Sequence, residues 1–235
     1  MSNLKCWAIV PAAGSGSRFG GTTPKQYIDL EGIPIIVRAV NALIKVEEIS
    51  GIAVGISPDD KWWAKCAIND RRVIGAFLGG ACRAETVLRG LEYLESSASA
   101  DDWVLVHDAA RPCIRIEDIK RVIAMRSNGS GGALLGTPIS ETVKYANQDN
   151  LVEKTIPRSN LWLAQTPQIF PYRLLYDALV KSDLETVTDE SSAIEAIGYR
   201  PYVIHGDSFN IKITTNRDLK IASLIMQYQS ASHLA

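Results

Sequence analysis

The sequence predicts an α/β protein in which helices flank a mostly parallel sheet and one β-hairpin protrudes. Three observations support this class. Short runs that are apolar throughout alternate with amphipathic helical patterns across residues 1–139, as expected for strands covered on both faces. Two runs of alternating polarity interrupt that rhythm between about residues 140 and 163. The chain has 235 residues, 46% of them hydrophobic and 22% charged, which suits one domain with a substantial core.

The first half of the chain reads as successive strand and helix units. The apolar run Cys6–Val10 leads into a glycine-rich loop, and Ser57 as N-cap followed by Pro58 and two acids favours the start of a helix. The remaining expected elements are a helix over Ile35–Lys45, strands over Gly51–Ser57, Val73–Leu78, Trp103–Val106 and Gly132–Ile139, and helices from Arg83 and around Ile116–Ile123. In both of the latter helices the apolar residues recur at helical spacing, so each presents one face to a sheet.

The segment Ser140–Leu163 has the signature of a hairpin. Residues 141–145 and 151–156 alternate in polarity on either side of the polar tip Ala146–Asn150. These strands offer few large apolar residues, and an isolated two-stranded hairpin is at best marginally stable in water. We therefore expect this arm to pack against a second copy of the chain in a homodimer.

The last part of the chain returns to short helices and strands. We expect helices near Leu174–Leu179 and Ala193–Ile197, a strand over Tyr202–Ile204, a strand over Asn210–Thr214 and a final helix from about Asn216, where Thr215 and Asp218 resemble a capping box. On the expected 210–214 strand, Lys212 points away from the face that Ile211 and Ile213 share. We therefore expect residues 1–235 to form one Rossmann-like domain with an excursion at about 140–163.

Composition and charge exclude several classes of function. Lys plus Arg number 25 and Asp plus Glu 26, a net charge of −1, which offers no basic footprint for nucleic acid. The longest apolar stretches are interrupted within about ten residues, short of the roughly 20 that a membrane span needs. The four cysteines and three histidines show no zinc-ligand spacing, and scattered thiols suit a reducing compartment. We expect a cytoplasmic enzyme with no nucleic-acid or membrane partner and with Cys6 in the core.

The glycine-rich loop after the first strand does not fit two familiar phosphate-binding motifs. A P-loop needs lysine directly after its last glycine, but Thr22 and Thr23 follow Gly21 and Lys25 comes too late. A dinucleotide motif needs GxGxxG running straight into a helix and an acid ending the second strand. Here the third glycine is one residue late and the second strand ends in Ser57.

A loop that wraps a nucleoside triphosphate fits better. The small residues around Gly14 and Gly16 allow backbone N–H groups to approach phosphates, while Arg18 and Lys25 supply positive charge. Displacement at an α-phosphate builds negative charge on the phosphorus oxygens and on pyrophosphate, and fixed cations with a metal stabilise that charge. The loop therefore indicates nucleotidyl transfer.

Six motifs in order along the chain point to one family. They are Pro11–Arg18, Pro24–Tyr27, His107–Pro112, Thr166–Gln168, Thr188–Glu190 and Asn210–Thr214. Together they resemble the 2-C-methyl-D-erythritol 4-phosphate cytidylyltransferases over essentially the whole chain. The resemblance implies transfer of CMP from CTP to methylerythritol phosphate, with release of pyrophosphate, in the non-mevalonate route to isoprenoid precursors.

The resemblance also assigns residues to roles. It implies that Arg18, Lys25, Arg158 and Lys212 act in catalysis, with Arg158 reaching the substrate phosphate of the neighbouring subunit. It implies CTP binding by Pro11, Ala12, Ala13, Gly14, Gly16, Gly80, Arg83, Thr86, Asp108 and Ala109, and binding of the polyol phosphate by Arg111, Thr142, Arg158, Thr166, Thr188 and Lys212. The family often has an acid after the Gly79-Gly80 pair, where this chain has Ala81 and Cys82.

Asp108 and His107 are interpreted from their position after a buried strand. Ligands of open α/β sheets bind at the carboxyl ends of strands, where the Asp108 carboxylate would hold Mg²⁺ or another divalent cation, or a ribose hydroxyl. The same carboxylate would also suit capping of its own loop. We assign no acid–base role to His107, which suits a packed, hydrogen-bonded histidine.

Some residues and motifs fit more than one role. Arg158 would also suit an ion pair at a dimer interface, and Thr188 a helix N-cap. The 210–214 motif would equally suit a ribitol 5-phosphate cytidylyltransferase, and a non-catalytic nucleotide-binding module would bind CTP without releasing pyrophosphate.

Overall fold

The computed structural model describes residues 4–14, 19, 23–127 and 131–232. A seven-stranded sheet in the order β11-β7-β10-β6-β1-β4-β5 forms its centre. The strands are β1 (Cys6–Pro11), β4 (Ile49–Ile56), β5 (Val73–Leu78), β6 (Trp103–Val106), β7 (Ala133–Pro138), β10 (Trp162–Pro171) and β11 (Tyr202–His205). β10 runs antiparallel to both of its neighbours, and every other pair is parallel. The predicted mostly parallel sheet is confirmed.

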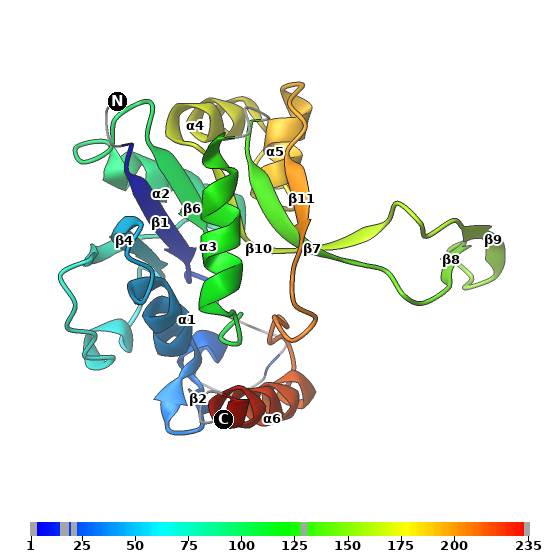
Figure 1. Cartoon of the computed structure of the whole chain (residues 1–235), viewed down its shortest axis with the longest axis horizontal. Helices are drawn as coiled ribbons and strands as arrows, with labels where there is room; N and C mark the ends of the chain where they lie inside the picture. The colour runs from blue at the N-terminus through cyan, green and yellow to red at the C-terminus, as the bar shows by residue number, and fades with distance from the viewer. Residues whose placement is uncertain (1–3, 15–18, 20–22, 128–130, 233–235) are drawn as a thin grey trace.

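Helices cover both faces of this sheet (Figure 1). Successive side chains of a strand point to opposite faces, so Cys6, Ala8 and Val10 of β1 pack with one set of helices and Trp7 and Ile9 with the other. The first set is α1 (Ile35–Ile44) and α3 (Ile116–Ala124), and the second is α2 (Arg83–Leu94), α4 (Tyr172–Lys181) and α5 (Glu190–Ala196). The Cys6 side chain is fully buried, as expected.

A third, smaller cluster holds the last helix, α6 (Asn216–Ser232), against the short strand β2 (Asp29–Leu30), which pairs with β3 (Ile33–Pro34). The Asp218 carboxylate accepts the backbone N–H of Thr215, and the Thr215 hydroxyl accepts that of Asp218, so the predicted capping box is present. Within the described part of the chain, no helix combines the length and apolarity needed to cross a bilayer.

The chain order reverses beside β1. From β1 the sheet continues to β4 and β5 on one side, and the next strand, β6, returns to the other side of β1. In open α/β sheets such a switch point opens a crevice at the carboxyl ends of the two diverging strands. The loops after β1 and β6, which carry Ala12–Gly14 and His107–Arg111, meet in that crevice.

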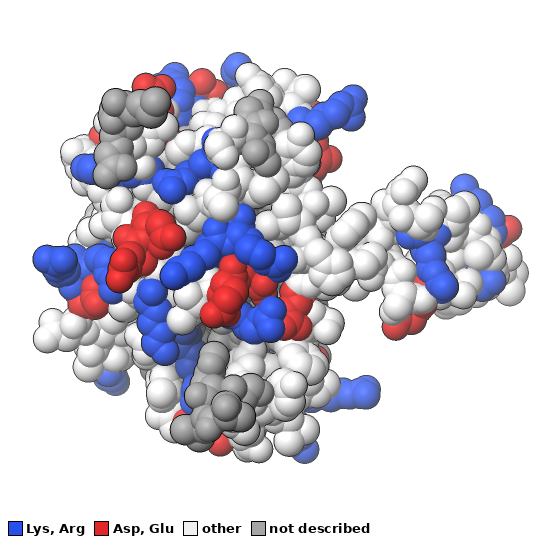
Figure 2. Space-filling view, viewed as in Figure 1, with Lys and Arg blue, Asp and Glu red and all other residues white. Residues whose placement is uncertain are grey.

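The predicted arm is present and projects from the body (Figure 1). Its strands β8 (Val143–Ala146) and β9 (Val152–Ile156) pair antiparallel with each other. Apolar side chains stay exposed on it, with Tyr145 at 53%, Val152 at 61% and Leu151 at 64%. Figure 2 shows Lys and Arg side chains on the arm as well, which carries Lys144, Lys154 and Arg158.

The prediction that a helix starts at Ser57–Asp60 is wrong. The Asp60 carboxylate accepts the backbone N–H groups of Trp62 and Trp63 at 3.0 and 2.8 Å, and only a 3₁₀ turn, Trp63–Lys65, follows. Both tryptophans pack against the core formed with α1 and α3. An aspartate that caps its own loop in this way, together with apolar anchors, replaces the helix.

Two strand predictions also need correction. Residues 210–214 form no strand: the N–H groups of Asn210 and Ile211 donate to carbonyl oxygens of the preceding loop, and the Ile213 N–H donates to the Ala110 carbonyl oxygen at 2.9 Å. The side-chain alternation nevertheless holds, because Ile213 is buried and Lys212 is exposed. Conversely, β10 was not predicted beyond the arm, since its prolines and glutamines interrupt the apolar pattern.

Candidate active site

Two adjoining cavities open at the switch point of the sheet. The first, of about 240 Å³, is lined by Pro11, Ala12, Ala13, Gly14, Lys25, Gln26, Gly80, Ala81, Cys82, Arg83, Thr86, Asp108, Ala109, Ala110 and Lys212. The second, of about 230 Å³, is lined by Arg83, Asp108, Arg111, Ala164, Gln165, Thr166, Gln168, Thr188, Asp189 and Lys212. Arg83, Asp108 and Lys212 belong to both linings, so these three side chains form the boundary between the cavities.

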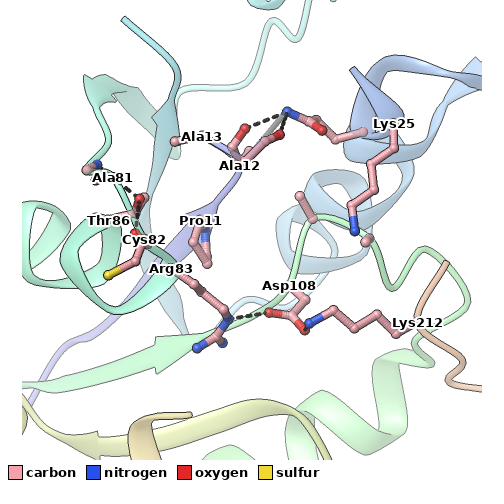
Figure 3. Close-up of a pocket in the computed structure, with 15 residues that line it drawn as sticks. Pro11, Ala12, Ala13, Lys25, Ala81, Cys82, Arg83, Thr86, Asp108 and Lys212 are labelled. Carbon is pink, nitrogen blue, oxygen red and sulfur yellow. Dashed lines mark hydrogen bonds and ion pairs between the residues drawn. The ribbon is translucent and has the colours of Figure 1, made fainter. Parts of the chain in front are cut away.

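The loop after β1 forms one wall of the first cavity. Its start continues the sheet, because the Ala12 N–H donates to the Gly55 carbonyl oxygen at 2.7 Å. The buried Gln26 amide then donates to the carbonyl oxygens of Ala12 and Gly14 at 2.6 and 3.1 Å. These bonds hold the small residues in place and set Lys25, next in sequence to Gln26, toward the cavity (Figure 3). Two predicted members of this loop, Gly16 and Arg18, lie outside the described residues.

The opposite wall is the turn between β5 and α2. Gly79 allows this turn to approach the β1 loop closely, since a Cβ there would clash with the Cβ of Ala13. The Thr86 hydroxyl donates to the Cys82 carbonyl oxygen at 3.0 Å and accepts the Gly80 N–H at 3.1 Å. Thr86 therefore shapes the turn, with its proton already committed to the backbone.

Asp108 is the centre of the site's charge. The Arg83 Nε donates to its Oδ1 at 2.8 Å and the Lys212 Nζ lies 2.9 Å from its Oδ2 (Figure 3). The Arg111 Nε lies 3.6 Å from the same Oδ2. Burial by itself would raise the pKa of the Asp108 carboxyl, but Arg83, Lys212 and Arg111 hold it well below its usual range. One buried carboxylate thus gathers three cationic groups at the boundary of the two cavities.

His107 is a packed histidine, as predicted. It is fully buried; its Nε2 donates to the Arg111 carbonyl oxygen at 3.1 Å and its Nδ1 lies 3.2 Å from the Thr166 hydroxyl oxygen. Because a carbonyl oxygen only accepts, the proton is assigned to Nε2. Burial lowers the pKa of His107 to about 4. A neutral ring therefore holds the loop that carries Asp108 and Arg111.

The donor set for a divalent cation is small. Among the residues that the structure describes, no three His, Cys, Asp or Glu side chains gather into a cluster that could hold a metal. Of the described residues that line the first cavity, Asp108 alone offers a carboxylate, and it is surrounded by cations. Mg²⁺ commonly binds through one or two carboxylates together with substrate phosphates. The site suits a cation that takes its other ligands from a bound triphosphate.

The second cavity collects part of the predicted polyol-phosphate set. Arg111, Thr166 and Thr188 line it, and the Thr166 hydroxyl also accepts the Asp108 N–H at 3.0 Å. The N-cap of α5 is Asp189, so Thr188 does not cap this helix. Thr142 and Arg158 are exposed on the arm and line neither cavity.

Four buried polar residues in or beside the site were given no role from the sequence: Gln26, Gln165, Gln168 and Glu190. Gln168 donates to the Asp189 carboxylate at 2.8 Å and accepts the Ser191 N–H at 3.0 Å. Glu190 is ion-paired with Arg83. Gln26, Gln168 and Glu190 lie inside motifs quoted above, but a glutamine in a loop or an acid in a helical first turn carries no sequence signal of burial.

Fold and site together define a class of protein. A doubly wound α/β sheet, a small-residue loop after its first strand and a cavity at the switch point that holds two lysines and a buried aspartate are the features of a nucleotidyltransferase. The model of the IspD family, 2-C-methyl-D-erythritol 4-phosphate cytidylyltransferase, matches residues 6–228. The chain belongs to this family.

The chain is similar to individual members of this family over nearly their full length. The 2-C-methyl-D-erythritol 4-phosphate cytidylyltransferases of Chromobacterium violaceum and Dechloromonas aromatica are each 45% identical to the chain, over 219 and 226 residues. These alignments cover 93% and 94% of this chain and 96% and 97% of the relatives. The crystal structure of the Francisella tularensis 2-C-methyl-D-erythritol 4-phosphate cytidylyltransferase has a TM-score of 0.81 at 35% identity, covering 94% of this chain and 99% of that one.

Family membership confirms the predicted enzyme class. The chain is a CTP-using cytidylyltransferase of the non-mevalonate pathway. It also favours methylerythritol phosphate over ribitol 5-phosphate as the acceptor, since the matching family and the relatives above carry the former in their names.

Proposed function

We propose that the first cavity binds CTP and the second binds 2-C-methyl-D-erythritol 4-phosphate, with residues 1–235 acting as one nucleotidyltransferase domain. A phosphate oxygen of the acceptor attacks the α-phosphorus of CTP, a new P–O–P bond forms, and the bond to the β-phosphate breaks to release pyrophosphate. The observation that carries this assignment is the shared boundary of the cavities, where Arg83, Asp108 and Lys212 lie. The two phosphates would meet at that boundary.

Lysine and arginine side chains supply the catalysis. Lys25 lines the first cavity and Lys212 both, so their ammonium groups would face the triphosphate and the developing charge on the α-phosphate. Arg18 would add a third cation. A phosphate monoester has a second pKa of about 6 and is already an anionic nucleophile near neutral pH, so no general base is required. Positioning of the two phosphates then dominates the rate enhancement.

Asp108 has two roles in this proposal. Before CTP binds, its carboxylate balances the charge of Lys212 and Arg83. With the triphosphate in place, Lys212 would turn to the phosphates and free Oδ2 as a ligand of Mg²⁺ or another divalent cation. When bound, such a cation would neutralise charge on the phosphates.

The arm completes the second site from a neighbouring copy. Its exposed Tyr145, Leu151 and Val152 would be covered in a homodimer, which accounts for a two-stranded hairpin far from the core. Thr142 and Arg158 would then reach the acceptor of the other protomer. A guanidinium binds a phosphate through two parallel hydrogen bonds, which suits Arg158 to this task.

Pyrophosphate release tests the assignment. The purified chain is assayed with each of the four nucleoside triphosphates against methylerythritol 4-phosphate and against ribitol 5-phosphate. We expect turnover with CTP and methylerythritol phosphate only, and we expect chelation of divalent cations to abolish it. A clear preference for ribitol phosphate would overturn the assignment of the acceptor. If pyrophosphate is still released after chelation, the proposed role of Asp108 as a metal ligand is refuted.

A further inference from the structure

Glu190 is a fully buried carboxylate beside the two cavities, although it lines neither. It lies at the first turn of α5 and binds Arg83 through both oxygens: Nη1 donates to Oε1 at 2.6 Å and Nη2 to Oε2 at 3.0 Å. Burial raises the pKa of the Glu190 carboxyl, and Arg83 opposes that rise. A buried charge of this kind is retained only when a partner satisfies it.

Consequently, all three nitrogen atoms of the Arg83 guanidinium donate hydrogen bonds to carboxylates. Its Nη atoms bind Glu190 and its Nε binds Asp108 at 2.8 Å. Burial works to lower the pKa of the guanidinium, but Glu190 and Asp108 raise it above its ordinary value. Arg83 thus stays charged, and its two carboxylate partners compensate that charge, so it is poorly placed to act as a phosphate ligand. Its geometry is that of a clamp between two acids.

The pairs form one chain of alternating charge. It runs from Glu190 to Arg83, on to Asp108 and from there to Lys212 (Figure 3 shows the last three). The bidentate pair with Glu190 fixes the plane of the Arg83 guanidinium. That plane determines the position from which Nε donates to Oδ1 of Asp108. The orientation of the Asp108 carboxylate in turn places Oδ2 at the ammonium of Lys212.

The same residue also fixes the turn before α5. Thr188, in the second cavity, stands two residues before Glu190 in this turn. Gln168 of β10 holds the turn through Asp189, and Glu190 holds it through Arg83 of α2. The Glu190–Arg83 pair therefore ties α5 to α2 across the boundary of both cavities.

We propose that Glu190 is a positioning residue for cytidylyl transfer, which acts through Arg83 on Asp108 and Lys212 and through its own turn on Thr188. This inference rests on the roles proposed above for Lys212 and Thr188. Glu190 contacts neither substrate; it sets the geometry of the groups that do. Its removal affects the chemical step and acceptor binding more than CTP binding.

The test compares Glu190→Gln with Glu195→Gln, a matched control on an exposed position of the same helix. Glutamine keeps the shape of the side chain but removes the charge that fixes Arg83. We expect Glu190→Gln to lower kcat by about tenfold or more and to raise KM for methylerythritol phosphate several-fold, with the Kd for CTP changed by less than about threefold. Glu195→Gln should match the wild type in all three. Unchanged kcat in Glu190→Gln, or an equal loss in both variants, would overturn the proposal.

A double-variant cycle separates positioning from a purely structural role. If Glu190 acts through Lys212, Glu190→Gln combined with Lys212→Ala should have nearly the kcat of Lys212→Ala alone. Losses that multiply in the double variant would refute the connection. Wild-type turnover by Lys212→Ala would instead refute the proposed role of Lys212, and Glu190 would still be judged from its own variant. Should Glu190→Gln fail to fold, Arg83→Lys tests the same connection, because lysine keeps the charge but loses the fork.

Discussion

The neutral, buried His107 makes the stability of this enzyme depend on pH, and the size of the effect follows from the structure. The ring satisfies its hydrogen bonds to Arg111 and Thr166 without a second proton. Burial lowers its pKa to about 4 in the folded chain, whereas an unfolded histidine titrates at about 6.5. The unfolded state therefore binds more protons between these two values.

The sign of the effect follows from linkage. Because the folded-state pKa is the lower one, stability is complete above about pH 6.5 and is lost as the pH falls toward about 4. Integrated between about pH 7.5 and about pH 5, a shift of this size lowers the free energy of unfolding by about 2 kcal/mol. Few other groups titrate in that window, which makes the contribution separable.

Urea unfolding at several pH values measures how the free energy of unfolding depends on pH. His107→Gln removes the titrating ring but keeps an amide that can donate a hydrogen bond, so this variant should be less stable than the wild type at about pH 7.5 and lose less stability on acidification. His205→Gln, at an exposed position, should follow the wild type. Equal slopes in the wild type and in His107→Gln would refute the reasoning.

Three further predictions concern the proposed site and the core. Lys212→Ala and Arg18→Ala should keep the circular dichroism spectrum of the wild type and lower kcat by about 10²–10³-fold, the usual cost of removing one stabilising group from a transition state; wild-type turnover in either would exclude that residue from catalysis. Arg158→Ala should raise KM for methylerythritol phosphate while leaving the Kd for CTP, measured by calorimetry, unchanged; a weakened CTP affinity would place Arg158 elsewhere. Asp102→Ala should lower the free energy of unfolding, measured in urea, by about 3 kcal/mol. The buried carboxylate accepts the N–H groups of Lys5, Trp7 and Ser99, and alanine leaves all three without their acceptor. A loss below about 1 kcal/mol would show that water replaces the carboxylate as acceptor.

The strands that are apolar throughout were predicted closely. Trp103–Val106 matches the structure residue for residue, since a central strand that is buried at every position must be apolar throughout. Val73–Leu78 also matches, although it is the edge strand β5 and leaves Ile74 and Leu78 exposed. β10 escaped prediction because several of its buried residues are polar. Gln168 is buried only because Asp189 and Ser191 satisfy its amide, and no local pattern shows a partner more than twenty residues away.

The failed helix at Ser57–Asp60 has a related cause. Its N-cap and first-turn residues are those of a helix start, but the same aspartate binds the backbone of Trp62 and Trp63, and the core takes up both rings. Local propensity and tertiary packing competed here, and packing prevailed.

Apart from the helix expected after Ser57 and the strand β10, the sequence alone determined the order of the β/α units, the arm and the family, together with the loops that carry the glycines and cations. Those features depend on local periodicity and on motifs, both of which are written along the chain. Only the tertiary structure decided how the charges of the site are balanced. Arg83 meets Asp108 25 positions away and Glu190 107 positions away, and the buried Asp108 gathers Lys212 from the far end of the chain. Ion pairs between buried groups depend on distance and burial in three dimensions, so the role of Glu190 could be inferred only from the tertiary structure.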